Sequence, residues 1–297
     1  MCCIVPFLFA EESAEKARKS DGYLLCLWIM TDHPLDGINL KLIRAQKHVD
    51  DVMGMLSLIK VGECCITPER NENLGLLVQR ISIQPKPPLE LSVVIGDFLF
   101  DVRSALDHLI WQLVIHNRGS PTSRNMFPIT SAPAQLNAAV AKRRRLEGVS
   151  PKTCAIIESL QPYHTGNEAL GRLDALHNAD KHRTLNLTTV VADNASLSFS
   201  TSGHPVLSML IGNEELRDGA VFGGIGIPLN DPEFTREFPE VIPRVSEAEV
   251  RGEASLFVAF DEAEVDSLED FRVDSTLQNI LEFVRNKVIL TFEPLFD

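Results

Sequence analysis

The stretch from Leu89 to His116 reads LELSVVIGDFLFDVRSALDHLIWQLVIH, and it decides the fold. Apolar residues lie on nearly every side of a helix drawn through it, and such a helix belongs at the centre of a bundle. The proline-rich segment 84–88 precedes it, and Pro88 suits the first turn of a helix. The sequence therefore predicts a central helix over residues 89–116.

Other segments repeat apolar residues at steps of three and four, which indicates amphipathic helices. These predicted helices cover residues 38–60, 134–146, 151–160, 167–182 and 274–292. After Thr184 the pattern changes to short runs that favour strands, at 185–191, 196–200, 206–211, 221–229 and 255–260. The predicted fold class is α+β, a helical bundle with an inserted, mainly antiparallel β-sheet subdomain.

The predicted organisation divides the chain into four parts. Residues 30–183 form a helical bundle with one strand near 74–83, residues 184–262 a β subdomain, and residues 263–297 a C-terminal helix that returns to the bundle. Within the subdomain, residues 230–250 read as a polar loop. Residues 1–29 fit neither a secretory signal nor a membrane span, so we expect a dispensable leader with Met30 as the natural start. The alternative is an N-terminal pair of strands.

Composition restricts the function. The net charge is −13 over 297 residues, so the chain repels phosphate backbones on average and any nucleic-acid contact needs a local basic patch. The six cysteines show no CxxC pair or disulfide framework, which suits a reducing cytoplasm. We therefore expect a soluble cytoplasmic protein without a membrane span.

Charged side chains interrupt the apolar central helix, and a charge removed from water must be paired. A structural interpretation pairs Arg103 with Asp107 at i,i+4 and hydrogen-bonds His108 to a neighbouring helix. A functional interpretation lets the Arg103 guanidinium hold a phosphate while the His108 imidazole transfers protons. Those are the parts that a metal-independent ribonuclease needs.

A second polar segment runs from Asp174 to Arg183 and places Asp174, His177 and Lys181 on one helix face. Its cations also suit a helix C-terminus without any function. Because the charges of the central helix need partners, we expect the two segments to touch, with Asp107, His177, Lys181 and His182 supporting the site.

Two further readings of the charged residues stay open. A metal site is the alternative, with candidate ligands Asp107, His108, His177, Asp180 and His182, but the chain has no HExxH pair and no cofactor is expected. The cluster Lys142, Arg143, Arg144 and Arg145 could supply a phosphate-facing patch, or it could be a solvated helix face.

The motif Arg103-Ser-Ala-Leu-Asp-His108 resembles the R-x4-6-H motif of HEPN proteins. That resemblance implies a helical, often dimeric protein and, in many members, RNA cleavage without metal, with Arg103 at the scissile phosphate and His108 transferring protons. The LDH and DKHR sequences of the two polar segments also resemble a group of bacterial proteins of unassigned function. The expected partners are RNA, a second copy of the chain, or the protein of a neighbouring gene.

Overall fold

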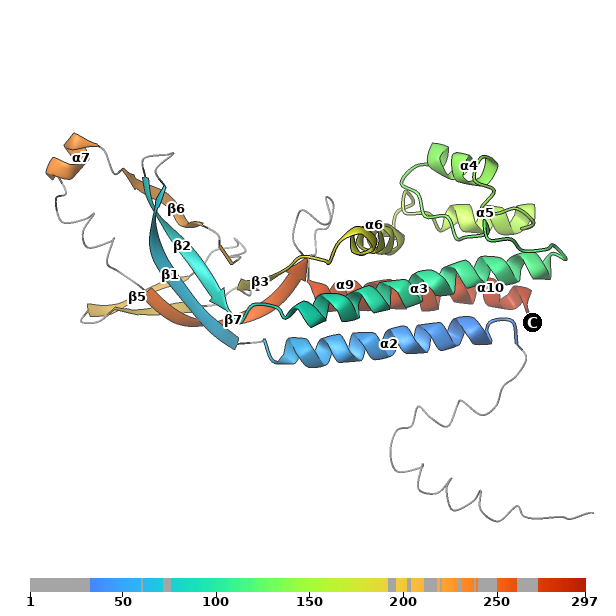
Figure 1. The fold of residues 1–297 in the computed structure, drawn as a ribbon, viewed down its shortest axis with the longest axis horizontal. Coiled ribbons are helices and arrows are strands. Elements are labelled where there is room, and N and C mark those ends of the chain that lie inside the picture. Colours follow the sequence, from blue (N-terminus) through green and yellow to red (C-terminus); the bar gives the residue numbers. More distant parts are fainter. Residues whose placement is uncertain are drawn as a thin grey trace, which may run out of the picture.

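The chain combines long helices with a twisted sheet at one end of them (Figure 1). The computed structural model describes residues 33–59, 61–71, 76–191, 196–201, 204–210, 218–219, 221–228, 231–237, 239, 250–260 and 272–297. The predicted leader, residues 1–29, lies outside the described residues. The α+β class is confirmed.

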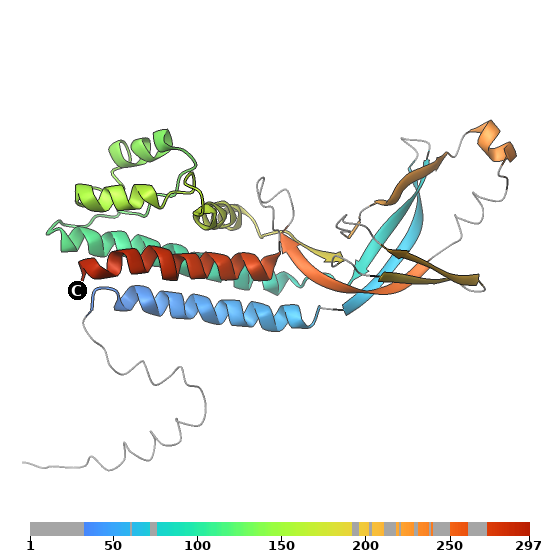
Figure 2. The ribbon, with the colours of Figure 1, turned by 180° about the vertical axis from the view of Figure 1, so that it is seen from behind.

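Three long helical segments run side by side. They are α2 (Asp36–Ser57), α3 (Leu89–His116) and the segment made of α9 (Val273–Phe283), the π-helical η3 (Val284–Ile289) and α10 (Leu290–Phe292). Helix α2 packs on α3 and on α9, and Figure 2 shows α9 covering the side of this layer that faces away in Figure 1. A final turn, η4 (Glu293–Leu295), ends the chain.

The predicted apolar periodicity accounts for the packing of α2. Its residues Leu42, Ala45, Val49 and Val52 are all buried, as a stripe at steps of three and four requires. The helix ends at Ser57 instead of the predicted position 60, because the chain turns there into a strand.

Three shorter helices follow α3. They are α4 (Pro133–Ala141), α5 (Pro151–Ser159) and α6 (Glu168–His182). The Ser150 hydroxyl accepts a hydrogen bond of 3.1 Å from the backbone N–H of Thr153, so α5 begins with a side-chain cap followed by proline. The predicted helix 134–146 ends early at Ala141, since Arg144 adopts a φ of 55°, which a helix cannot continue through.

Every strand pairing is antiparallel, and the order along the sheet is β5-β4-β7-β1-β2-β6, with β3 also paired to β7. The strands are β1 (Val61–Asn71), β2 (Leu76–Gln84), β3 (Leu187–Val191), β4 (Ser196–Thr201), β5 (His204–Leu210), β6 (Val221–Pro228) and β7 (Val250–Phe260). Strand β1 was not predicted, and the short helix α7 (Pro232–Glu237) lies in the predicted polar loop.

The central position predicted for α3 is only partly right. Its buried side packs on α2 and α6, but Val93, Phe100, Trp111 and Ile115 are exposed. Apolar content alone therefore overestimated how much of this helix is covered. Within the described residues, no helix has both the length and the apolar run that crossing a membrane requires.

Candidate functional site

Arg103 and Asp107 of α3 together hold the backbone of Phe127. Arg103 Nη2 donates a hydrogen bond of 2.6 Å to the carbonyl oxygen of Phe127, and Asp107 Oδ1 accepts one of 2.9 Å from its N–H. The two side chains also form the predicted i,i+4 pair, with 3.5 Å between Arg103 Nη2 and Asp107 Oδ1. Arg103 is only 7% exposed, so this arrangement anchors the segment after α3 to the helix from the inside.

Helix α6 and the end of the basic run face the same cluster. Burial, then the charges of Arg103 and Lys181, lower the pKa of His177, which favours its neutral form. Burial and Arg103 also lower the pKa of Arg145. Burial raises the pKa of Asp107 even though Arg103 opposes that shift. Arg103, Asp107, Arg145 and His177 therefore lie near enough for their charges to act on one another, and we call these four residues the Arg103 cluster.

The helices that carry the two polar segments, α3 and α6, pack together. One close approach is at Gly96 of α3, outside the first segment, where an added Cβ would lie 2.7 Å from Asp180 Oδ1. Lys181 and His182 are exposed at the end of α6. In the basic run, Lys142, Arg143 and Arg144 are exposed and Arg144 pairs with Glu147, whereas Arg145 turns inward.

His108 lies on the other flank of α3. Residues five apart on an α-helix point about 140° apart, so Arg103 and His108 diverge. The His108 ring faces α2, where a Cβ at Gly37 would lie 2.7 Å from its Cε1, and its Nε2 is 3.3 Å from Gln112 Nε2 of its own helix. Burial and the charge of Lys41 lower its pKa. Arg103 and His108 therefore point to different sides of α3, and among the described residues no hydrogen bond joins His108 to a neighbouring helix.

The alternative metal ligands are also dispersed. Asp107 and His177 belong to the Arg103 cluster, His108 faces α2, Asp180 packs on Gly96, and His182 is exposed. Among the described residues, no three His, Cys, Asp or Glu side chains are placed to hold a metal ion.

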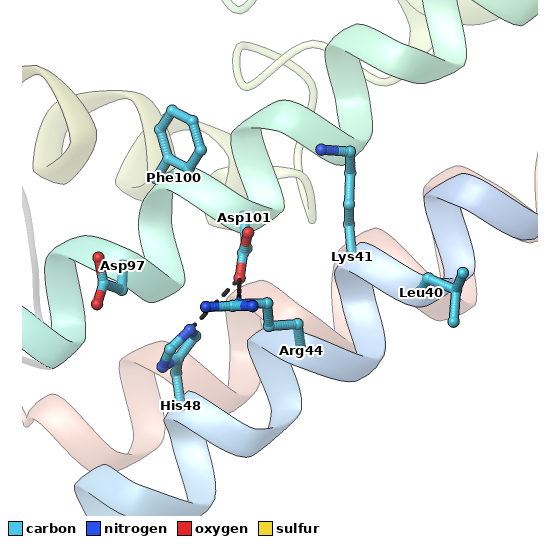
Figure 3. A pocket seen from close by; sticks show the side chains of 7 residues that line it. All are labelled: Leu40, Lys41, Arg44, His48, Asp97, Phe100 and Asp101. Atoms are coloured by element: carbon cyan, nitrogen blue, oxygen red, sulfur yellow. Dashed lines mark ion pairs between the residues drawn. The ribbon is translucent and has the colours of Figure 1, made fainter. Parts of the chain in front are cut away.

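Sequence reasoning missed a groove of about 500 Å³ between α2 and α3 (Figure 3). At its floor, Asp101 Oδ2 lies 3.4 Å from Arg44 Nε and 3.4 Å from His48 Nε2. The groove is lined by Leu40, Lys41, Arg44, His48, Asp97, Phe100 and Asp101.

Exposed apolar side chains lie beside the groove on α3. Val93, Phe100, Trp111 and Ile115 are 55%, 63%, 42% and 48% exposed, and their spacings of 7, 11 and 4 put them within one narrow sector of the helix. We call these four residues the α3 stripe. This spacing was visible in the sequence, but it was read as one more buried face.

A scan against protein-family models finds no match, and searches among curated proteins and solved structures find none either. The site must therefore be interpreted from its own geometry.

Proposed function

We propose that this chain is a noncatalytic interaction protein that binds a protein partner through the face made of α2 and the α3 stripe. The observation that carries the proposal is the exposure of the four apolar side chains of the stripe on one side of one helix. Exposed apolar side chains that gather on one side of a helix indicate a binding surface, whereas singly scattered ones need no explanation. Aromatic anchors such as Phe100 and Trp111 are also the side chains that contribute most at protein interfaces.

The state of Arg103 supports a structural role for the polar residues. A catalytic arginine must reach its substrate, whereas this one is buried and bonded to the Phe127 backbone. The hydrogen bonds of Arg103 and Asp107 to the Phe127 backbone fix the segment after α3, a role that requires no chemistry. Under the proposal, α2, α3, α6 and α9 act as a helical bundle that presents the binding face. The sequence, which has no CxxC pair or disulfide framework, supports a cytoplasmic location.

Site-specific photo-crosslinking tests this function. A photoreactive phenylalanine analogue is introduced at Phe100 or Trp111 of the full chain and, as a control, at Leu290, which is 53% exposed on α10. After irradiation in cells, we expect protein adducts from the first two positions and none from Leu290. Adducts absent from all three positions would overturn the proposal.

RNA binding, with a HEPN-like ribonuclease as its catalytic form, is the second candidate. One observation favours it, since two arginines and a histidine from separate segments converge in the Arg103 cluster. Guanidinium groups suit phosphate, and an imidazole beside them could transfer a proton. Under this candidate Arg103 acts with His177 instead of the predicted His108, so His177→Ala is the variant that must be inactive while folded.

A further inference from the structure

We infer that the partner on the α2/α3 face is a second copy of this chain, placed so that α2 of each copy lies on α3 of the other. This inference rests on the proposed function, because it names the occupant of the same surface. Three properties of the face support it: its size, the distribution of charge between its two helices at the groove, and the exposed carboxylate of Asp97, which forms no ion pair with any described residue.

The size of the face suits a stable dimer. The α3 stripe extends over 22 residue steps, or about 33 Å at about 1.5 Å per residue. Helices α2 and α3 lie side by side and are each about 10 Å across, so the face is about 20 Å wide and covers roughly 700 Å². Stable interfaces bury about 800 Å² on each partner, so two such faces are close to the usual area.

The charges of the face are divided between its two helices. Within α3 the only basic side chain besides histidine is the buried Arg103, whereas Asp97 and Asp101 face the groove. Helix α2 brings Lys41 and Arg44 to the same groove, and Lys47 is exposed one turn further along. At the groove, the cations of α2 therefore lie beside the acids of α3, while further along α2 the exposed Asp51 follows Lys47 by one turn.

This division selects one arrangement of two copies. A two-fold axis parallel to the helices puts the groove cations of α2 in each copy, Lys41 and Arg44, over the groove acids of α3 in the other. The contact occurs twice by symmetry. A two-fold axis across the helices would put α3 on α3 and acid against acid, which costs binding energy. Charge complementarity thus favours the α2-on-α3 arrangement.

In the inferred dimer, the second copy supplies a cation to Asp97. It is exposed and forms no ion pair with any described residue, while its charge helps to raise the pKa of Asp180 on α6, after burial. Arg44 is 73% exposed at the side chain, and among the described residues its one ion pair is with Asp101. In the inferred dimer, Arg44 and Lys47 of one copy approach Asp97 of the other beside the Phe100 ring, where a cation is also attracted to the aromatic face.

Charge reversal in two complementary variants tests the arrangement. Sedimentation equilibrium of the full chain should give twice the 33.0 kDa of one chain. Asp97→Arg sets arginine against Arg44 of the other copy, and Arg44→Glu sets glutamate against Asp97, so each variant alone should dimerise at least tenfold more weakly. An equal mixture of the two should recover the dimer, because both contacts in the mixed dimer are then attractive.

Controls keep the outcome decisive. Lys47→Glu replaces Arg44→Glu if the latter disturbs Asp101 and fails to fold by circular dichroism. Glu282→Arg, an exposed acid on α9 away from the face, should leave the dimer unchanged. If each variant alone dimerises weakly and their mixture also stays monomeric, the arrangement is overturned. If the wild type is monomeric at about 100 µM, the second copy is not the partner. Adducts to a different protein from Phe100 would then leave the proposed function standing.

Discussion

The guanidinium of Arg103 and the carbonyl of Phe127, 24 residues apart in the chain, are joined by a hydrogen bond of 2.6 Å inside the protein. We expect Arg103→Ala to lower the free energy of unfolding by about 2–4 kcal/mol, because it leaves that carbonyl unpaired and Asp107 buried without its cation. Urea denaturation measures this loss. The matched control Arg143→Ala, at an exposed position of the basic run, should change stability by less than about 0.5 kcal/mol. An Arg103→Ala protein of unchanged stability would contradict the structural role.

Protonation of His177 at low pH should lower the free energy of unfolding. Burial, followed by Arg103 and Lys181, lowers its pKa in the folded protein below the ordinary 6.5, so the unfolded chain binds the proton more readily. The contribution of neutral His177 to the free energy of unfolding is therefore fully present above about pH 6.5, and it is lost as the pH falls through the pKa of His177 in the folded protein. His108 has the same sign, whereas the raised pKa of Asp107 acts in the opposite direction at lower pH.

Replacing His177 by glutamine isolates this effect. We expect His177→Gln to lose less stability than the wild type between about pH 7 and pH 5, since it has no imidazole to protonate. Thermal melts over this range measure the slope, and His182→Gln, at an exposed position, should leave it unchanged. Equal slopes in wild type and His177→Gln would reject burial of a neutral His177.

The helices were predictable because burial follows their periodicity. In α2 the predicted apolar positions are buried, and the bounds of α5 and α6 differ from prediction by one residue. Strand β1 escaped prediction, because its residues Cys64, Cys65 and Pro68 do not form the β-branched, alternating run by which a strand is recognised.

The candidate site was less predictable than the fold. Linear spacing brought Arg103 and His108 together in a motif, but a helix turns about 100° per residue and sends them to opposite flanks. The i,i+4 pair Arg103 and Asp107 was correct for the same geometric reason. Phe127 and Arg145 complete the cluster from a loop, and no local pattern indicates which loop residue returns to a given helix.

RNA assays separate the two candidate functions. Under the interaction proposal we expect no cleavage of mixed RNA by the wild type in chelator. Under the second candidate, cleavage appears and is lost in Arg103→Ala and His177→Ala, while His108→Ala retains it because His108 faces α2. Binding to RNA would also weaken steeply with salt and on replacing Lys142, Arg143 and Arg144 by alanine. Cleavage by folded wild type that both variants abolish would favour the nuclease over the interaction protein.

Two phenylalanines of α3 give the sharpest contrast between core and interface. Phe98 is fully buried, whereas Phe100, two positions on, is 63% exposed. Phe98→Ala should lower the free energy of unfolding by about 3–5 kcal/mol, because it opens a cavity among packed side chains. Phe100→Ala should cost under about 0.5 kcal/mol in the dilute protein, where no partner covers the ring.

At high protein concentration the cost of Phe100→Ala should grow, because dimerisation stabilises the wild type by mass action and the variant gains less from it. Urea titrations of both variants at two protein concentrations about a hundredfold apart measure this. A large loss for Phe100→Ala that does not depend on concentration would assign the ring to the core of the single chain and remove the basis for a binding face.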